Sequence, residues 1–329
     1  MTKSHLIRDS AVITSSTIPS VKYSCSGSPL RFSNGSTAID GLSGSGSSVK
    51  AAAAVIGSEV EPTLQAAEIR RSAERPTNDL TAYDLYLRAL ALSFSWERGG
   101  LIHALELLGQ AIERDPHYGL ALVLAARCNV DLHVNGWTED AETNRRNGVD
   151  LARRALGFAG GEPEVLAIAA HALAYFGEDI HAGIELVDRA LELNPSSALG
   201  WQRSGWLRLW AGQPDLAIKH FETSLRLNPR EHRANPFMGI GVGHFFAGRF
   251  EEAKTMLLLS LQEKPDWVPT HRFLASCFAH MGRLDEAVEA VRGLRTLTNV
   301  VVPSAAHWRN PEHRELYLSG LRLAAGEGT

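Results

Sequence analysis

Residues Ala198–Glu231 read ALGWQRSGWLRLWAGQPDLAIKHFETSLRLNPRE, a stretch that predicts two antiparallel helices packed against each other. Gly205 and Ala217 lie in different halves of the stretch and are small, so the two helices can approach closely there. Trp201 and Phe221 are large and apolar, and they are expected to fill the remaining space between the helices. The stretch therefore predicts one helical hairpin.

Two further residues mark where the helices of this hairpin end. Gly212 lies at the turn, where a positive φ costs glycine little, and Pro229 follows the second helix and cannot continue it. The same ending recurs in four segments with a small residue five places before a proline: LLGQAIERDP (107–116), LVDRALELNP (186–195), HFETSLRLNP (220–229) and MLLLSLQEKP (256–265). The last three prolines are 34 and 36 residues apart, and a period of this length is typical of a helical solenoid.

The repeat resembles the tetratricopeptide repeat (TPR). Six residues of the hairpin fall where that family places its large, small, turn, small, aromatic and terminating residues: Trp201, Gly205, Gly212, Ala217, Phe221 and Pro229. Degenerate copies with the same frame lie on both sides of it. The resemblance implies an all-α fold, a right-handed superhelix of five or six helical hairpins. It also implies a non-catalytic protein-interaction scaffold whose concave groove binds a peptide or a partner helix.

Composition divides the chain into four parts. Residues 1–57 are rich in serine and glycine, and we expect a disordered tail because so few large apolar residues cannot offset the entropy of folding. Residues 58–80 are expected to form a connecting helix or linker, residues 81–300 the repeat array, and residues 301–329 a linker and a capping helix. A flexible tether, a phosphorylation target and sequence without a folded role stay open for the tail.

The last helix is expected over Pro311–Ala325. Four leucines are expected to form its inner, apolar face, namely Leu316, Leu318, Leu321 and Leu323. Its other face is polar, so the helix suits the end of a solenoid, which needs a polar cap to stay soluble.

Two segments near the ends of the array carry a second resemblance. Ala52–Leu92 and Arg309–Glu327 are similar to segments of bacterial proteins in which a class III adenylate/guanylate cyclase domain, or a winged-helix DNA-binding domain, precedes a TPR region. The resemblance implies, as the alternative function, the regulatory C-terminal portion or a truncated remnant of such a signalling protein. The stretch before Ala52 is too short and too rich in serine and glycine for a cyclase domain, so no enzymatic activity is expected. Self-association, or pairing with an intact cyclase or regulator paralogue, is a further expectation.

Charge and composition exclude several classes of function. The net charge of the 329-residue chain is −4, so no basic field is expected to hold nucleic acid. No apolar run reaches the roughly 18–20 residues of a membrane span, and the N-terminus lacks the apolar core of a secretion signal. Cys25, Cys128 and Cys277 are scattered, as in proteins of a reducing compartment, so a cytoplasmic location is expected. The second resemblance implies that the protein is bacterial.

Three patterns that could carry chemistry are explained more simply by structure. Acidic pairs recur just before or within the first turn of expected second helices, where the helix dipole favours negative charge: 139–140, 178–179, 251–252 and 285–286. Gly239, Gly241 and Gly243 lie inside an expected helix rather than after a strand, so close packing explains them better than phosphate binding. Cys277 and His280 lack the second ligand pair of a zinc site. No catalytic residue, cofactor or metal ion is therefore expected.

The concave groove of such an array is lined by the first helices of successive hairpins. In the frame of Ala198–Glu231, seven residues are expected to line it and to bind the partner: Tyr175, Gln202, Trp206, Asn235, Met238, Phe245 and Arg272. Aromatic residues, methionine and arginine are enriched where proteins bind partners. Packing between helices is the open alternative for Tyr175, Trp206 and Phe245.

Overall fold

The computed structural model describes residues 82–327, apart from 96 and 231. This part of the chain forms thirteen helices and no strand, which confirms the all-α prediction. The segments 1–57 and 58–80, for which a disordered tail and a linker are predicted, lie outside the described residues. Among the helices that the structure describes, none has both the length and the apolar character needed to cross a membrane.

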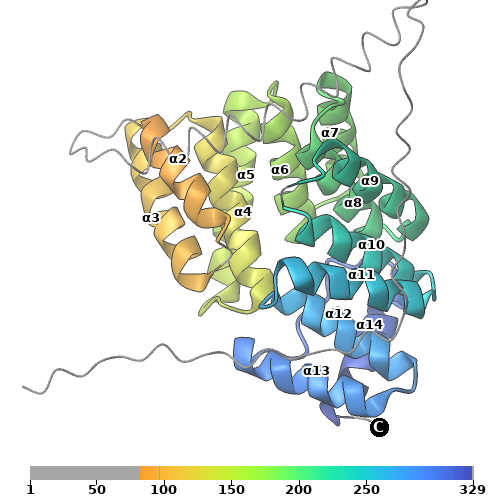
Figure 1. Cartoon of the computed structure of the whole chain (residues 1–329). Coiled ribbons are helices and arrows are strands. Elements are labelled where there is room, and N and C mark those ends of the chain that lie inside the picture. The colour runs from red at the N-terminus through yellow and green to blue at the C-terminus, as the bar shows by residue number, and fades with distance from the viewer. Residues whose placement is uncertain (1–81, 96, 231, 328–329) are drawn as a thin grey trace, which may run out of the picture. The chain divides into compact units, whose positions relative to one another are not determined.

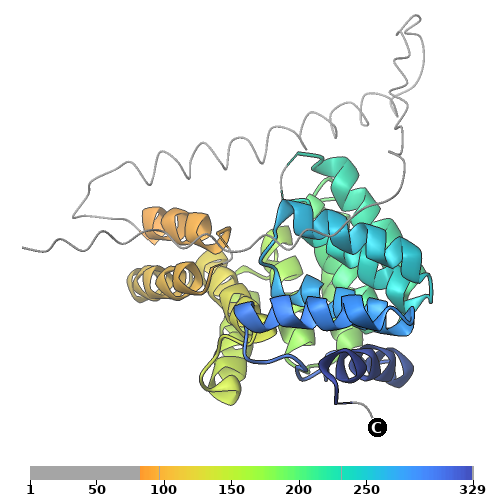
Figure 2. The same cartoon turned by 60° about the horizontal axis from the view of Figure 1, so that its bottom comes forward.

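Twelve of these helices pair as six successive hairpins, in agreement with the predicted five or six. The first helices of the hairpins are α2 (Ala82–Ser93), α4 (Gly119–Asn135), α6 (Pro163–Tyr175), α8 (Ala198–Trp210), α10 (Ala234–Phe246) and α12 (Val268–His280). The second helices are α3 (Arg98–Arg114), α5 (Ala141–Ala159), α7 (Ile180–Leu193), α9 (Pro214–Leu227), α11 (Phe250–Glu263) and α13 (Leu284–Leu297). Figure 1 shows the hairpins following one another in chain order, from orange to blue, in a curved array, and Figure 2 turns it by 60°.

Close packing of α8, α9 and α10 depends on the residues that the repeat motif places there. Phe221 on α9 is fully buried. A Cβ atom added to Gly205 would lie 2.8 Å from the Phe221 ring, and one added to Gly239 would lie 2.3 Å from it. Gly241 and Gly243 approach side chains of α11 and α9 in the same way. The three glycines of α10 therefore serve close helix packing, as predicted.

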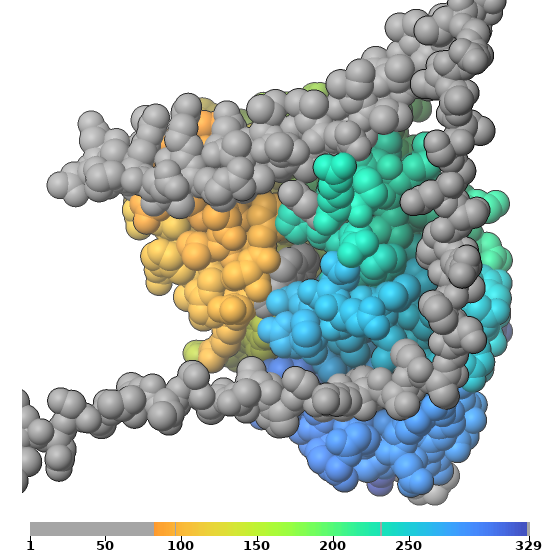
Figure 3. Space-filling model, in the orientation of Figure 1, coloured from red at the N-terminus to blue at the C-terminus, as the bar shows by residue number. Residues whose placement is uncertain are grey.

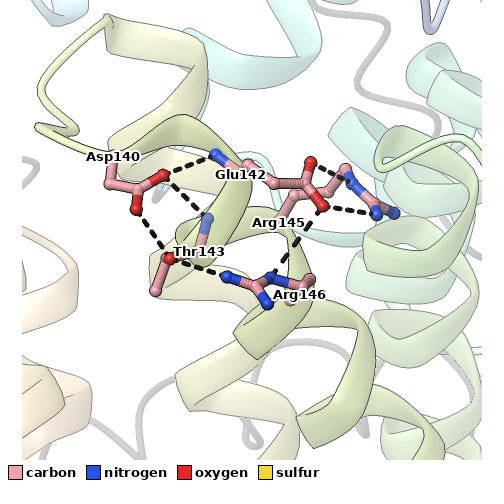
Figure 4. Close-up of polar contacts among 5 residues, drawn as sticks. All are labelled: Asp140, Glu142, Thr143, Arg145 and Arg146. Carbon is pink, nitrogen blue, oxygen red and sulfur yellow. Dashed lines mark hydrogen bonds and ion pairs between the residues drawn. The ribbon is translucent and has the colours of Figure 1, made fainter.

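The acidic pairs lie at the beginnings of second helices, also as predicted. Asp140 caps α5, because its Oδ1 atom accepts hydrogen bonds from the backbone N–H groups of Glu142 (3.1 Å) and Thr143 (3.0 Å). Glu142 in turn pairs with Arg145 at 2.9 Å and with Arg146 at 3.9 Å, as Figure 4 shows. The bonds that Asp140 accepts satisfy N–H groups that have no partner within the helix, so its carboxylate has a structural role.

The array curves far enough for its two ends to meet. On α12, Arg272 donates a hydrogen bond to the carbonyl oxygen of Val134 on α4 across 2.6 Å. Lys264, just after α11, donates to the carbonyl oxygen of Ser95, just after α2, across 3.2 Å. In the space-filling view, the surfaces of the N-terminal and C-terminal hairpins meet on one face (Figure 3). The six hairpins therefore form a ring whose ends are in contact.

Residues 298–310, which join α13 to α14 (Pro311–Ala325), cross the concave side of this ring and are named the strap here. The backbone N–H of Arg309 donates to the carbonyl oxygen of Trp210 at the end of α8 (2.9 Å). The Arg309 guanidinium donates to the carbonyl oxygen of Ala174 near the end of α6 (2.7 Å). Carbonyl groups at helix C-termini lack helical partners, and a cation also interacts favourably with the dipole there. The predicted linker is therefore part of the concave side.

Helix α14 has the predicted bounds, but its buried face differs from the prediction. The buried residues are Tyr317, Gly320, Leu321 and Ala324, whereas Leu323 is exposed. A Cβ atom on Gly320 would lie 2.2 Å from Oγ of Ser276 on α12, and that hydroxyl donates to the carbonyl oxygen of Tyr317 (3.1 Å). The prediction that Leu323 faces inward is wrong, because this close contact turns the glycine side of α14 toward α12.

Candidate functional site: a cavity at the centre of the ring

A cavity of about 310 Å³ lies at the centre of the ring. Its wall is built by α4, α6, α8, α10 and α12, and by the strap and α14. Seven tryptophan, tyrosine and phenylalanine side chains line the wall: Tyr175, Trp206, Trp210, Trp267, Phe273, Trp308 and Tyr317. A cavity of this size, with apolar and aromatic walls and a few polar groups, has the character of a ligand-binding site.

Five of the seven residues predicted for the groove line this cavity: Tyr175, Trp206, Asn235, Met238 and Arg272. Trp206 donates from Nε1 to Oδ1 of Asn235 across 2.7 Å, which fixes both side chains in the wall. Tyr175 contacts the ring of His307 on the strap, with 4.9 Å between the ring centroids. The structure therefore brings these five residues together, while their contact with a partner stays a prediction.

The other two predicted residues are not part of the cavity wall. Phe245 is fully buried, and its ring contacts those of Phe250 and Phe273 with 5.6 Å between centroids in each case. It packs between helices because α11 and α12 cover the C-terminal end of α10. Gln202 is half-buried and lies outside the wall. It precedes the cavity residue Arg203 by one position, and because successive residues of a helix point about 100° apart, its side chain points away from the cavity.

Arg272, predicted as a polar anchor for a partner, connects parts of the ring. Its side chain is almost fully buried and donates to the carbonyl oxygens of Val134 and Val300, each across 2.6 Å. Burial lowers the pKa of this guanidinium from its usual value. Hydrogen bonds to two carbonyl groups compensate part of the desolvation of the charge. Arg272 therefore joins α12 to both α4 and the strap.

Buried charges gather where α4, α6 and α8 meet the cavity. Arg127 and Asp131 lie one turn apart on α4 and form an ion pair, with 3.6 Å between Nε and Oδ2. Arg203 on α8 is only 3% exposed, and its Nη1 atom lies 3.5 Å from Nε2 of His171 on α6. Burial is the main cause that raises the pKa of Asp131 and lowers that of Arg203 to about 10. Burial also lowers the pKa of His171 well below its usual value, so this imidazole is neutral near pH 7.

Sequence reasoning missed Arg203, His171 and the strap. Arg203 precedes Trp206 by three residues and Trp210 by seven, so the three share one face of α8, and this spacing could have identified it. No comparable signal marks the strap, because a short non-helical segment has no hydrophobic periodicity. Its contacts with α6, α8 and α12 are set by tertiary structure alone.

Comparisons with known proteins give structural neighbours but no sequence relatives: no family model matches the chain, and no curated protein matches it. Human IFIT1, in a structure with m7Gppp-AAAA, has a TM-score of 0.57 and 15% identity over 69% of this chain and 53% of that chain. The Cut9–Hcn1 hetero-tetramer of APC/C contains a chain with a TM-score of 0.51 and 13% identity, over 73% of this chain and 43% of that one. The TPR protein TTC0263 of Thermus thermophilus has a TM-score of 0.46 and 18% identity over 60% of this chain and 99% of its own.

These likenesses concern the fold alone. This chain spans about half the length of the IFIT1 chain and less than half of the matched chain of the Cut9–Hcn1 assembly. Six successive hairpins with the predicted glycine and phenylalanine contacts show a helical-repeat fold of the tetratricopeptide type. Folds of this class carry many unrelated ligands, so function has to be argued from the cavity.

Proposed function

We propose that this chain is a non-catalytic binding protein that holds a peptide segment of a partner protein on the concave side of its ring. The observation that carries this proposal is the strap, because the concave side already accommodates one non-helical segment of the chain itself. Trp308 of the strap contacts the rings of Phe246 and Phe273, with 4.7 and 5.7 Å between centroids. Aromatic surfaces of this kind suit a second segment, and the cavity beside the strap offers it space.

The test uses peptides selected from a random displayed library on the full chain, with affinity measured by fluorescence anisotropy. Ser304 is exposed on the strap and lines the cavity, so a Ser304→Trp substitution would block the cavity without disturbing a helix. We expect this variant to bind selected peptides about ten-fold more weakly or worse, since a contact worth 1.4 kcal/mol is a factor of ten. Gln110→Trp, on the exposed face of α3, is the matched control and should bind normally.

The proposal fails if no peptide is enriched, or if Ser304→Trp binds the selected peptides as tightly as the unaltered chain. Circular dichroism of both variants would show that helix content is unchanged. Equal loss of affinity in Gln110→Trp would place the binding surface outside the cavity.

Capped RNA is the competing ligand class, because the human IFIT1 structure holds m7Gppp-AAAA. The net charge of −4 opposes the binding of a polyphosphate to this chain. The anisotropy test therefore includes a capped oligonucleotide, and tighter binding of it than of any selected peptide would overturn the peptide proposal.

As an alternative, we propose that the chain is the regulatory portion of a bacterial cyclase-type or winged-helix signalling protein that acts in the cytoplasm. Its support is the sequence resemblance of Ala52–Leu92 and Arg309–Glu327, the second of which covers α14. Co-expression with a paralogue that carries an intact effector domain tests it, and the absence of any co-purified complex would count against it.

A further inference from the structure

Among the described residues, the buried cation Arg203 in the cavity wall has neither a counterion of its own nor carbonyl acceptors like those that hold Arg272. Arg203 is 3% exposed, and its Nε atom has no hydrogen-bond partner among the described residues. Within the described part of the chain, the polar side-chain contact of its guanidinium is the 3.5 Å approach of Nη1 to the neutral imidazole of His171. Asp131 is close enough to act on the charge of Arg203, but its carboxylate pairs with Arg127 at 3.6 Å.

The positive charge of Arg127, in contrast, is compensated by several neighbouring groups. Besides Asp131, it donates to Oγ of Ser93 across 2.6 Å, and its guanidinium lies over the ring of Phe94 at 5.4 Å from the centroid. Two guanidinium groups thus share one carboxylate, which leaves one positive charge at Arg203 in a largely dehydrated site. Removing a charge from water without pairing it is unfavourable, and the lowered pKa of Arg203, to about 10, reflects this burial and the repulsion by Arg127.

The space in front of Arg203 is suited to a flat apolar group. The cavity volume of about 310 Å³ lies at the small end of the range for ligand pockets, roughly 300–1,000 Å³. Trp206 and Trp210 follow Arg203 on the same face of α8, and His307 of the strap lies 5.7 Å from Trp210 between ring centroids. Planar rings on several sides favour a ligand whose body is itself planar.

We propose that the cavity binds a small organic monocarboxylate with a planar apolar body, and that the Arg203 guanidinium donates hydrogen bonds to its carboxylate. Arg272 also lines the cavity, but its guanidinium is held by two carbonyl oxygens, so Arg203 is the guanidinium left to bind a ligand, and its fork matches the two oxygens of a carboxylate. A phosphate dianion would add a second negative charge beside Asp131, which opposes it. This site goes beyond the proposed function and requires no protein partner.

The experiment measures binding of benzoate, 3-phenylpropionate and indole-3-acetate to the full chain by isothermal titration calorimetry. Quenching of tryptophan fluorescence is a second readout, since Trp206, Trp210 and Trp308 line the cavity. Indole-3-acetamide has the same ring system as indole-3-acetate but no charge, so it tests the contribution of the carboxylate. Phenyl phosphate tests whether a dianion binds. We expect at least one acid to bind, and its Kd to rise about ten-fold or more when the carboxylate is replaced by an amide, because a charge-assisted pair is lost.

Arg203→Gln should weaken acid binding by a similar factor. Arg208→Gln, on the same helix but paired with Asp188 at 2.6 Å, is the control that should leave binding unchanged. The proposal is overturned if none of the three acids binds, or if the amide binds as tightly as the acid. It is also overturned if phenyl phosphate binds more tightly than every acid, or if a folded Arg203→Gln variant binds the acid as tightly as the unaltered chain. If Arg203→Gln does not fold, the acid and amide comparison on the unaltered chain decides the question. Selected peptides that still bind while every acid fails would leave the proposed function intact and remove this inference alone.

Discussion

Phe221 is the residue around which the packing of three helices is arranged. Its fully buried ring faces Gly205 on α8 and Gly239 on α10, and no side chain fits at either position without displacing the ring. Both glycines lie inside helices, where glycine is intrinsically unfavourable by up to about 1 kcal/mol relative to alanine. The close approach that they allow therefore outweighs their cost in helix propensity.

We expect Gly239→Ala to lower the free energy of unfolding by about 1–3 kcal/mol, because the new Cβ atom would lie 2.3 Å from the Phe221 ring and overlap it. Gly109→Ala is the matched control on α3, since nothing lies within 4 Å of its Cβ position, and it should stabilise the chain by up to about 1 kcal/mol. Urea denaturation followed by circular dichroism measures both. An equal effect of the two substitutions would contradict the packing argument.

Residue spacing predicted most of the cavity wall but not its details. Trp206 and Met238 were predictable because the repeat frame fixes which face of a first helix is concave. Phe245 lies on the same helix as Met238, yet its position at the covered end of α10 depends on how α11 and α12 converge, which periodicity does not encode. Arg203 was overlooked because a buried unpaired cation is recognisable only when its surroundings are known.

Among the elements of the fold, the strap places a titratable side chain, His307, in the wall of the cavity. Burial, and next the charge of Arg309, lower the pKa of His307 to about 3 from an ordinary value of 6.5. The unfolded chain therefore binds a proton at this residue near pH 6.5, whereas the folded chain does so only near pH 3. Its contribution to stability is complete above pH 6.5 and is lost as the pH falls toward 3.

We expect His307→Gln to make the loss of stability between pH 6 and pH 4 shallower, by up to about 1.4 kcal/mol per pH unit. Denaturant unfolding at several pH values measures this slope. His181→Gln changes an exposed histidine on α7 and should leave the slope as it is. If the slope is the same in all three chains, then His307 takes up its proton in the folded chain without lowering the stability of that chain.

The strap is also the element whose structure could not be predicted from the sequence. Hairpin pairing followed from proline and glycine spacing, and the bounds of the last helix, Pro311–Ala325, were predicted correctly. The segment between α13 and α14 was predicted only as a linker, because its contacts join it to helices more than a hundred residues earlier, such as the bond from Arg309 to Ala174.

For the whole molecule, Arg272 supplies the buried contact among those that close the ring, beside the exposed bond from Lys264 to Ser95. We expect Arg272→Met to lower the free energy of unfolding by about 2–4 kcal/mol, because the carbonyl groups of Val134 and Val300 lose a charged donor. The radius of gyration from small-angle X-ray scattering should increase as the ends separate. Arg226→Met, at an exposed position near the end of α9, is the control for both measurements. A destabilised variant with an unchanged radius would mean that other contacts close the ring.

Contact between the two ends has a consequence for how such a chain can evolve. In an open array, a repeat can be gained or lost by duplication or deletion, because each hairpin contacts only its neighbours. Here the bond between α12 and α4 is possible only when the intervening hairpins turn the chain through the correct total angle. An inserted or deleted hairpin would pull these helices apart, so the number of repeats is fixed. The chain can then diversify only by substitution and by changes in its loops.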